Sequence, residues 1–64
     1  MADYEQWLAR QLQRESGCAY MAALSAVRRT AAALRAANMP AEERYPHMAS
    51  LPIAAFGLRK KEEQ

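Results

Sequence analysis

The chain has very few of the residues that usually cross-link a small protein or build a reactive site. Its 64 residues include one cysteine, one histidine and two glycines. A lone cysteine excludes an internal disulfide, and two isolated glycines do not make a glycine-rich phosphate-binding loop. One histidine with one cysteine offers no cluster of metal-ligating side chains. We therefore expect no cofactor and no bound metal.

Long apolar stretches are absent as well. No segment approaches the roughly 18 consecutive apolar residues that a membrane-spanning helix requires, so we expect no membrane partner. The N-terminal residues include Asp3 and Glu5, where a secretory signal peptide would be basic. These features favour a cytoplasmic protein.

Large apolar side chains are scarce, although 52% of the residues are hydrophobic. Fifteen of the 33 hydrophobic residues are alanine, which leaves 18 larger ones. A core of that size rarely contributes more than about 3–5 kcal/mol of stability. The sequence therefore predicts a single domain over residues 1–64 that gains stability by forming a homodimer.

Apolar spacing predicts a first helix over residues 3–15. Asp3 can accept hydrogen bonds from the first-turn amides, and Gly17 suits the left-handed turn that ends a helix. Trp7 shares the apolar stripe and is expected in the core. The stripe consists of Tyr4, Trp7, Leu8 and Leu12, spaced as one face of a helix.

A second helix is predicted over residues 18–37, with Ser16 as a candidate N-cap and with Asn38 and Pro40 closing it. Its larger side chains form a seam with alternating spacings of four and three, namely Tyr20, Leu24, Val27, Ala31 and Leu34. A parallel row of small residues comprises Ala23, Ala26, Thr30, Ala33 and Ala37. We expect one of these two sides to pack on the first helix and the other on a second copy of the chain.

The rest of the chain is predicted to be less regular. Pro40 can begin a short helix over 40–45, and Pro46 is expected to end it because proline removes a backbone donor. The segment 46–59 is either a helix capped by Ser50 or an extended strand-like stretch. Residues 60–64 are expected to form a frayed, solvated end. The expected fold class is all-α: a small helical hairpin with a short C-terminal segment, assembled as a homodimeric helical bundle.

Catalysis is not indicated by any group of residues. Cys18 and His47 are the only candidates for a nucleophile–base pair, and a free cysteine in an alanine-rich stretch is usually a small buried apolar residue. A chain this short also lacks the walls of a water-excluding pocket. We predict that the protein is not an enzyme.

Protein binding is the function that the composition favours. Tyrosine, tryptophan, methionine and arginine are enriched at interfaces, and the chain holds more of them than two helices can bury. The predicted partner-binding residues are Arg44, Tyr45, His47 and Met48. We predict a small accessory protein, of the kind that phages and mobile elements encode, that inhibits or adapts a larger partner such as a host defence or regulatory protein.

Two alternatives remain open at this point. The net charge of +2 does not by itself indicate nucleic-acid binding, but the charges are unevenly distributed. The segment between Ser16 and Met39 has three arginines and no acidic residue. A small DNA- or RNA-binding regulator would use this basic face, and a binder of an anionic nucleotide would use it at a dimer interface. The residues for either alternative are Tyr20, Arg28, Arg29 and Arg35.

Overall fold

The computed structural model describes residues 2–60 of the chain, with side chains from residue 4 onward. It confirms the all-α prediction, and it contains no strand within that range. The elements are three α-helices and one short 3₁₀ helix: α1 (Ala2–Ser16), α2 (Tyr20–Ala36), α3 (Ala41–Ser50) and η1 (Ile53–Phe56). The predicted cap at the Asp3 side chain and most of the predicted frayed end lie outside the described residues.

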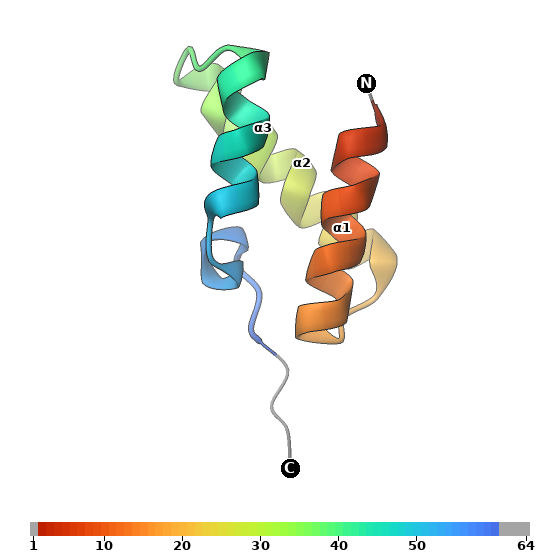
Figure 1. Cartoon of the computed structure of the whole chain (residues 1–64). Coiled ribbons are helices and arrows are strands. Elements are labelled where there is room, and N and C mark those ends of the chain that lie inside the picture. Colours follow the sequence, from red (N-terminus) through yellow and green to blue (C-terminus); the bar gives the residue numbers. More distant parts are fainter. Residues whose placement is uncertain (1, 61–64) are drawn as a thin grey trace.

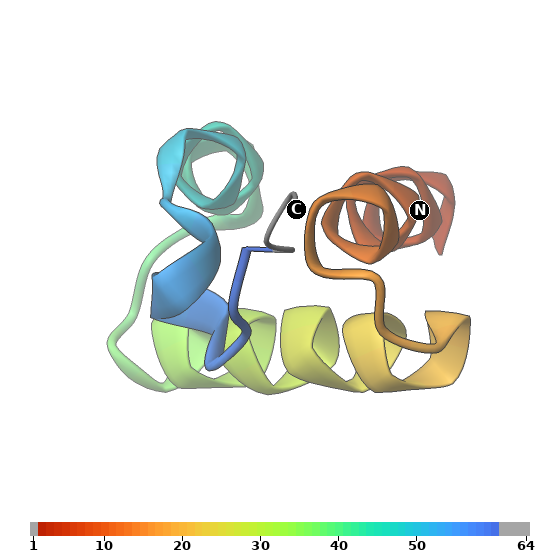
Figure 2. The ribbon, with the colours of Figure 1, turned by 90° about the horizontal axis from the view of Figure 1, so that it is seen from below.

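The three helices form two layers. In Figure 1, α1 and α3 run side by side in the same direction, and α2 crosses behind both of them. The view from below shows α1 and α3 together over α2, with η1 lying close to α2 on the side of α3 (Figure 2). The protein is therefore a three-helix arrangement within one chain rather than a two-helix hairpin with an appended tail.

The turn between α1 and α2 follows the predicted chemistry at its start. Gly17 has a φ of 74°, and its amide donates to the carbonyl of Gln13 at 2.8 Å, which closes α1 with a left-handed residue. Ser16 does not cap the second helix directly, because its Oγ accepts from the amide of Cys18 at 3.2 Å. The cap residue of α2 is Ala19, which supplies no side-chain hydrogen bond.

Small residues allow α1 and α2 to approach closely. Ala9 and Ala23 are 0% exposed and Ala26 is 1% exposed, so the N-terminal part of the row of small residues faces the interior of the same chain. Ala33 and Ala37, at its C-terminal end, are exposed. Leu24 and Val27 from the seam are buried too. The buried core comprises Leu8, Ala9, Leu12, Ala23, Leu24, Ala26, Val27, Met48 and Phe56.

This core changes the role of the two rows predicted on the second helix. Four of their members are buried against α1 and the α3–η1 segment within one chain, namely Ala23, Leu24, Ala26 and Val27. The third helix therefore covers a surface that the sequence analysis had assigned to a second copy.

The end of α2 is formed as predicted. Asn38 has a φ of 67°, in the left-handed region that asparagine tolerates better than most residues. The amide of Asn38 donates to the carbonyl of Arg35 at 2.9 Å, and the amide of Met39 donates to that of Leu34 at 3.1 Å. These two hydrogen bonds make a Schellman motif, which reverses the chain into α3.

The prediction that Pro46 ends the third helix is wrong. The helix begins after Pro40 as predicted, but it continues through Pro46 to Ser50. Pro46 removes only one helical hydrogen bond, the one to the carbonyl of Glu42, and Glu42 is exposed so that water can take its place. Burial of Met48, which is 0% exposed, favours the extra turn.

The C-terminal segment matches neither of the two predicted forms. Ser50 is the last residue of α3, where its Oγ donates to the carbonyl of His47 at 2.7 Å, so it does not cap a following helix. After Pro52, the chain makes the single turn η1, which Gly57 ends with a φ of 79°. That turn places Phe56 in the core, where it is 4% exposed.

Candidate functional site

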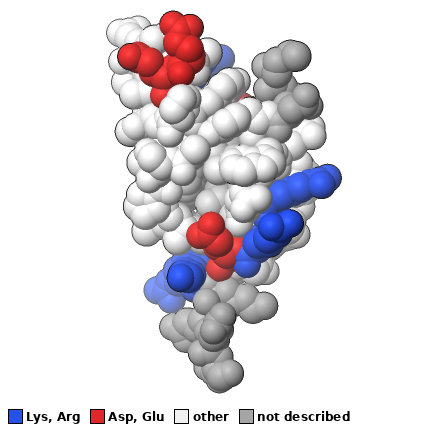
Figure 3. Space-filling model, in the orientation of Figure 1, with Lys and Arg blue, Asp and Glu red and all other residues white. Residues whose placement is uncertain are grey.

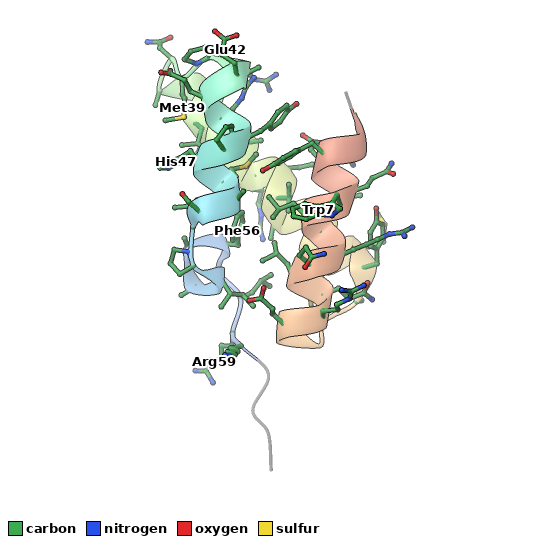
Figure 4. All side chains as sticks on the ribbon, in the orientation of Figure 1. Trp7, Met39, Glu42, His47, Phe56 and Arg59 are labelled. Carbon is green, nitrogen blue, oxygen red and sulfur yellow. The ribbon has the colours of Figure 1, made fainter. Side chains whose placement is uncertain are left out.

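Trp7 lies on the surface, which overturns the prediction that it belongs to the core. Its side chain is 54% exposed, whereas Leu8 and Leu12 are buried. The buried side of α1 is centred on Leu8, Ala9 and Leu12, and Trp7 sits at the border of that stripe. Figure 4 shows Trp7 on α1, on the side that faces the viewer.

Trp7 forms one wall of a hollow between α1 and the α3–η1 segment. We call this hollow, whose volume is about 200 Å³, the apolar groove. Eight of its ten lining residues are apolar, and the buried Met48 and Phe56 are among them. The lining residues are Trp7, Leu8, Gln11, Leu12, Glu15, Met48, Ala49, Leu51, Ile53 and Phe56.

The surface around the apolar groove carries little charge. In Figure 3, drawn from the same side as Figure 1, the middle of the face over α1 and α3 is free of charged side chains. Acidic side chains gather at the upper end over α3, and charged groups of both signs lie around the lower margin. A neutral centre with a charged margin is the composition of a protein–protein interface.

An aromatic contact joins α1 to α3 near their N-terminal ends. The rings of Tyr4 and Tyr45 stack with their centroids 4.4 Å apart and their planes inclined by 23°. The hydroxyl of Tyr4 donates to the backbone carbonyl of Tyr45. Partial burial, together with the neighbouring Tyr45 phenol, raises the pKa of the Tyr4 hydroxyl above its ordinary value of 10.0. Tyr4 also packs on Trp7, with ring centroids 6.2 Å apart.

The four residues predicted to bind a partner do not form one surface. Met48 is fully buried, so its side chain is not available to a partner in this fold, and its assignment as a surface contact is corrected. Tyr45 is partly buried against Tyr4. His47 is exposed on the side of α3 that is turned away from α1 (Figure 4), and Arg44 lines a different hollow.

That second hollow lies where α1, α2 and α3 meet. We call it the arginine pocket; its volume is about 380 Å³. It brings together side chains that the sequence analysis had assigned to separate functions, since Arg28 and Arg35 come from the basic face and Arg44 from the predicted anchor. The lining residues are Glu5, Arg28, Ala31, Ala32, Arg35, Arg44 and Tyr45.

Charge in the arginine pocket is only partly balanced. Arg28 lies 3.8 Å from the carboxylate of Glu5, a pair whose side chains are 60% and 25% exposed. It is the one ion pair among the described side chains, so neither Arg35 nor Arg44 has an acidic partner within that part of the chain. The Nε of Arg44 is buried and has no hydrogen-bond partner there.

Two residues of the predicted basic face lie outside the arginine pocket. Arg29 is exposed on α2 and lines neither the arginine pocket nor the apolar groove. Tyr20 lines a shallow hollow of about 560 Å³ on α1, together with Gln6, Arg10, Gln13 and Arg14. The predicted set of Tyr20, Arg28, Arg29 and Arg35 is thus divided, and only Arg28 and Arg35 share a pocket.

The candidates for other chemistry do not gather into a site. Cys18 is in the α1–α2 turn, where its Sγ lies 2.9 Å from the Oγ of Ser16, whereas His47 is on α3. Within residues 4–60, no three side chains of the metal-ligating types stand close enough to hold an ion. No helix in the described range has the length and hydropathy needed to cross a bilayer.

Comparisons with protein-family models, curated proteins and solved structures found no match to this chain.

The sequence patterns predicted neither the apolar groove nor the arginine pocket. Sequence reasoning treated Trp7 as core because the residue falls on the apolar stripe, whereas the neighbouring Ala9 is the residue that is buried. It missed the link between Arg44 and the basic face because that link depends on how α3 docks on α2, which the spacing within either helix does not specify. A useful signal was present in Met48, whose spacing from Tyr45 fits one face of a helix that continues past the proline.

Proposed function

We propose that the protein is a non-enzymatic accessory protein that binds a larger partner protein through the apolar groove, with Trp7 as its anchor. The observation that carries the proposal is the position of Trp7, a large side chain left 54% exposed at the edge of an apolar hollow. Tryptophan is among the residues that most often dominate binding energy at protein interfaces. Inhibition or adaptation of the partner follows from covering its surface.

The walls of the groove indicate what the partner must offer. One wall is the face of α1 that carries Trp7 and Leu8, and the other is formed by Leu51 and Ile53 in the segment after α3. Gln11 and Glu15 are the polar residues of the lining. An amphipathic segment of the partner, with one apolar side chain to insert and a donor or cation for Glu15, matches this chemistry.

A second copy of the chain is the main competing occupant of the groove. The predicted homodimer would use the seam and the row of small residues of α2, but four of those ten residues, Ala23, Leu24, Ala26 and Val27, are buried within one chain. A homodimer would therefore have to use the Trp7 face or the outer face of α2. We favour a different protein. Trp7 forms one wall of the groove in its own chain, and inserting it into the groove of a second copy would remove that wall.

The test compares two charge-introducing variants at exposed apolar residues. Trp7→Glu alters the groove, and Met21→Glu is the matched control, because Met21 is 66% exposed and lines none of the described hollows. Tagged wild type and both variants are incubated with nuclease-treated host lysate, and the captured proteins are quantified by mass spectrometry. We expect a dominant protein whose capture falls at least tenfold with Trp7→Glu and is unchanged with Met21→Glu.

Trp7 also supplies a direct signal, since it is the single tryptophan of the chain. Titration of the captured partner into purified protein should shift the Trp7 emission to shorter wavelength as water is excluded. Equal loss of capture in both variants would contradict the groove as the site. Dimer formation by wild type that Trp7→Glu abolishes, with no other protein captured, would replace the partner with a second copy. Capture from untreated lysate that is lost when the lysate is treated with nuclease would instead favour nucleic acid.

A further inference from the structure

We propose that the arginine pocket is a binding site for a small phosphorylated molecule, which one chain holds between α2 and the N-terminal half of α3. The site shares no residue with the apolar groove, so it goes beyond the proposed function and does not depend on it. The sequence analysis had placed an anionic ligand at a dimer interface. The structure instead places the cationic groups around one hollow of a single chain.

The pocket owes its shape to alanine. Arg28 and Arg35 are seven residues apart, so they lie on one side of α2 and about 10 Å apart along its axis. Ala31 and Ala32 lie between them and form a floor that is only one methyl group high. Arg44 and Tyr45 of α3 make the facing wall. The volume of about 380 Å³ lies within the range of small-molecule sites.

The charge of the pocket selects an anion. Three guanidinium groups and one carboxylate give the lining a formal charge of +2. Glu5, the single acid, is already beside Arg28 at 3.8 Å and leaves the other two arginines without an acidic partner among the described residues. Three like charges around one hollow repel one another, and an anion between them would relieve that repulsion.

The chemistry of the donors favours a phosphate group over a single carboxylate. A guanidinium presents several N–H donors in a planar fork that matches phosphate oxygens, and a phosphomonoester carries a charge of about −1.5 to −2 at neutral pH. That charge balances the formal charge of the lining. The Nε of Arg44 is buried and has no partner among the described residues, so at least one donor of this guanidinium is left unsatisfied by that part of the chain.

Ligand binding is tested by titration calorimetry with three probes: inorganic phosphate, adenosine 5′-monophosphate and adenosine. Both phosphate-bearing probes should bind, and adenosine should not. If the monophosphate binds at least tenfold more tightly than inorganic phosphate, the site takes an organic phosphate; equal affinities identify free phosphate as sufficient. The Arg44 Nε–H resonance should shift in NMR spectra on addition of either phosphate probe, because this group lies at the pocket wall.

Two pairs of variants separate a shaped pocket from general surface charge. Ala32→Leu fills the floor without changing any charge, and Ala33→Leu is its exposed neighbour outside the pocket. Arg35→Gln removes a pocket charge, and Arg29→Gln removes one outside it. We expect Ala32→Leu and Arg35→Gln each to weaken monophosphate binding at least tenfold, and the two control variants to change it less than twofold.

Several results would overturn the proposal. One is the absence of detectable binding by either phosphate probe at concentrations up to about 10 mM. Another is equal weakening by Arg29→Gln and Arg35→Gln, which would indicate a diffuse basic surface. Much tighter binding of a 20-base-pair DNA with a steep salt dependence would favour nucleic acid instead. Circular dichroism of each variant confirms that the comparison is between folded proteins.

Discussion

The apolar groove and the arginine pocket have opposite chemistry, although residues of both α1 and α3 line each of them. The apolar groove is lined by α1 from Trp7 to Glu15 and by residues after Pro46, and its one charged residue is Glu15. The arginine pocket is lined by the N-terminal part of α1, the N-terminal half of α3 and the C-terminal half of α2. The Tyr4–Tyr45 stack lies between α1 and α3 close to the pocket.

The comparison shows how a chain with few large apolar residues can still offer two different surfaces. Alanine supplies the close contact between α1 and α2, so Trp7 is not required to complete the core and remains at the surface. Alanine also forms the floor of the pocket, where a larger residue would fill the space between the arginines. Small side chains thus leave Trp7 exposed at the apolar groove and leave space between the arginines of the pocket.

The largest expected change in the free energy of unfolding comes from truncating Met48, a buried side chain that lines the apolar groove. Met48→Ala should lower the free energy of unfolding by about 2–5 kcal/mol, because Met48 is 0% exposed and its loss leaves a cavity. His47→Ala, at the exposed neighbouring position, should change it by less than about 0.5 kcal/mol. Urea denaturation followed by circular dichroism measures both. Similar stabilities for the two variants would contradict the placement of Met48 in the core.

An intermediate effect is expected at the aromatic contact between α1 and α3. Tyr4→Phe keeps the ring but removes the hydroxyl that donates to the carbonyl of Tyr45, so it should cost about 0.5–1.5 kcal/mol at neutral pH. Because folding raises the pKa of Tyr4, its hydroxyl stabilises the protein below pH 10 and ceases to do so as the pH rises through the folded-state pKa.

The pH dependence of the unfolding free energy tests whether the Tyr4 hydroxyl is the group responsible. The difference in unfolding free energy between wild type and Tyr4→Phe should be constant from pH 6 to about pH 9 and should shrink above about pH 10. Denaturant titrations at each pH provide the measurement. A difference that stays constant into alkaline solution would show that the hydroxyl makes no hydrogen bond specific to the folded state.

The smallest effects are expected at the exposed arginines. Arg28→Ala removes a partly exposed ion pair with Glu5 and should cost between 0 and about 1 kcal/mol, less at high salt. Arg29→Ala should change stability by less than about 0.5 kcal/mol, since Arg29 is exposed and makes no ion pair with a described residue. A large loss at Arg29 would show that α2 uses its outer face for assembly.

Much of the fold followed from local sequence patterns. The first two helices, the left-handed Gly17, the end of the second helix at Asn38 and the start of the third helix at Pro40 were predicted from periodicity and capping rules. The third helix beyond Pro46 was not, because proline disfavours a helix locally and the burial of Met48 that outweighs it depends on the whole fold. The turn η1 is set by the need to bury Phe56, which is equally non-local.

The candidate sites were less predictable than the helices. A periodic pattern shows that Trp7 and Leu8 are close on a helix, but only packing decides which of the two is buried. Likewise, Arg28 and Arg35 share a face by their spacing, whereas their meeting with Arg44 depends on how α3 docks on α2. The sequence therefore showed which apolar and basic residue types are available, whereas the tertiary structure determines which of them lie together.

We propose that the apolar groove and the arginine pocket are separate sites with separate ligands. The most direct test measures partner capture and monophosphate binding for two variants, Trp7→Glu and Ala32→Leu. We expect Trp7→Glu to lose partner capture and keep monophosphate binding, and Ala32→Leu to do the reverse. If either folded variant loses both activities, the two hollows act as one site, and the claim of separate sites is wrong.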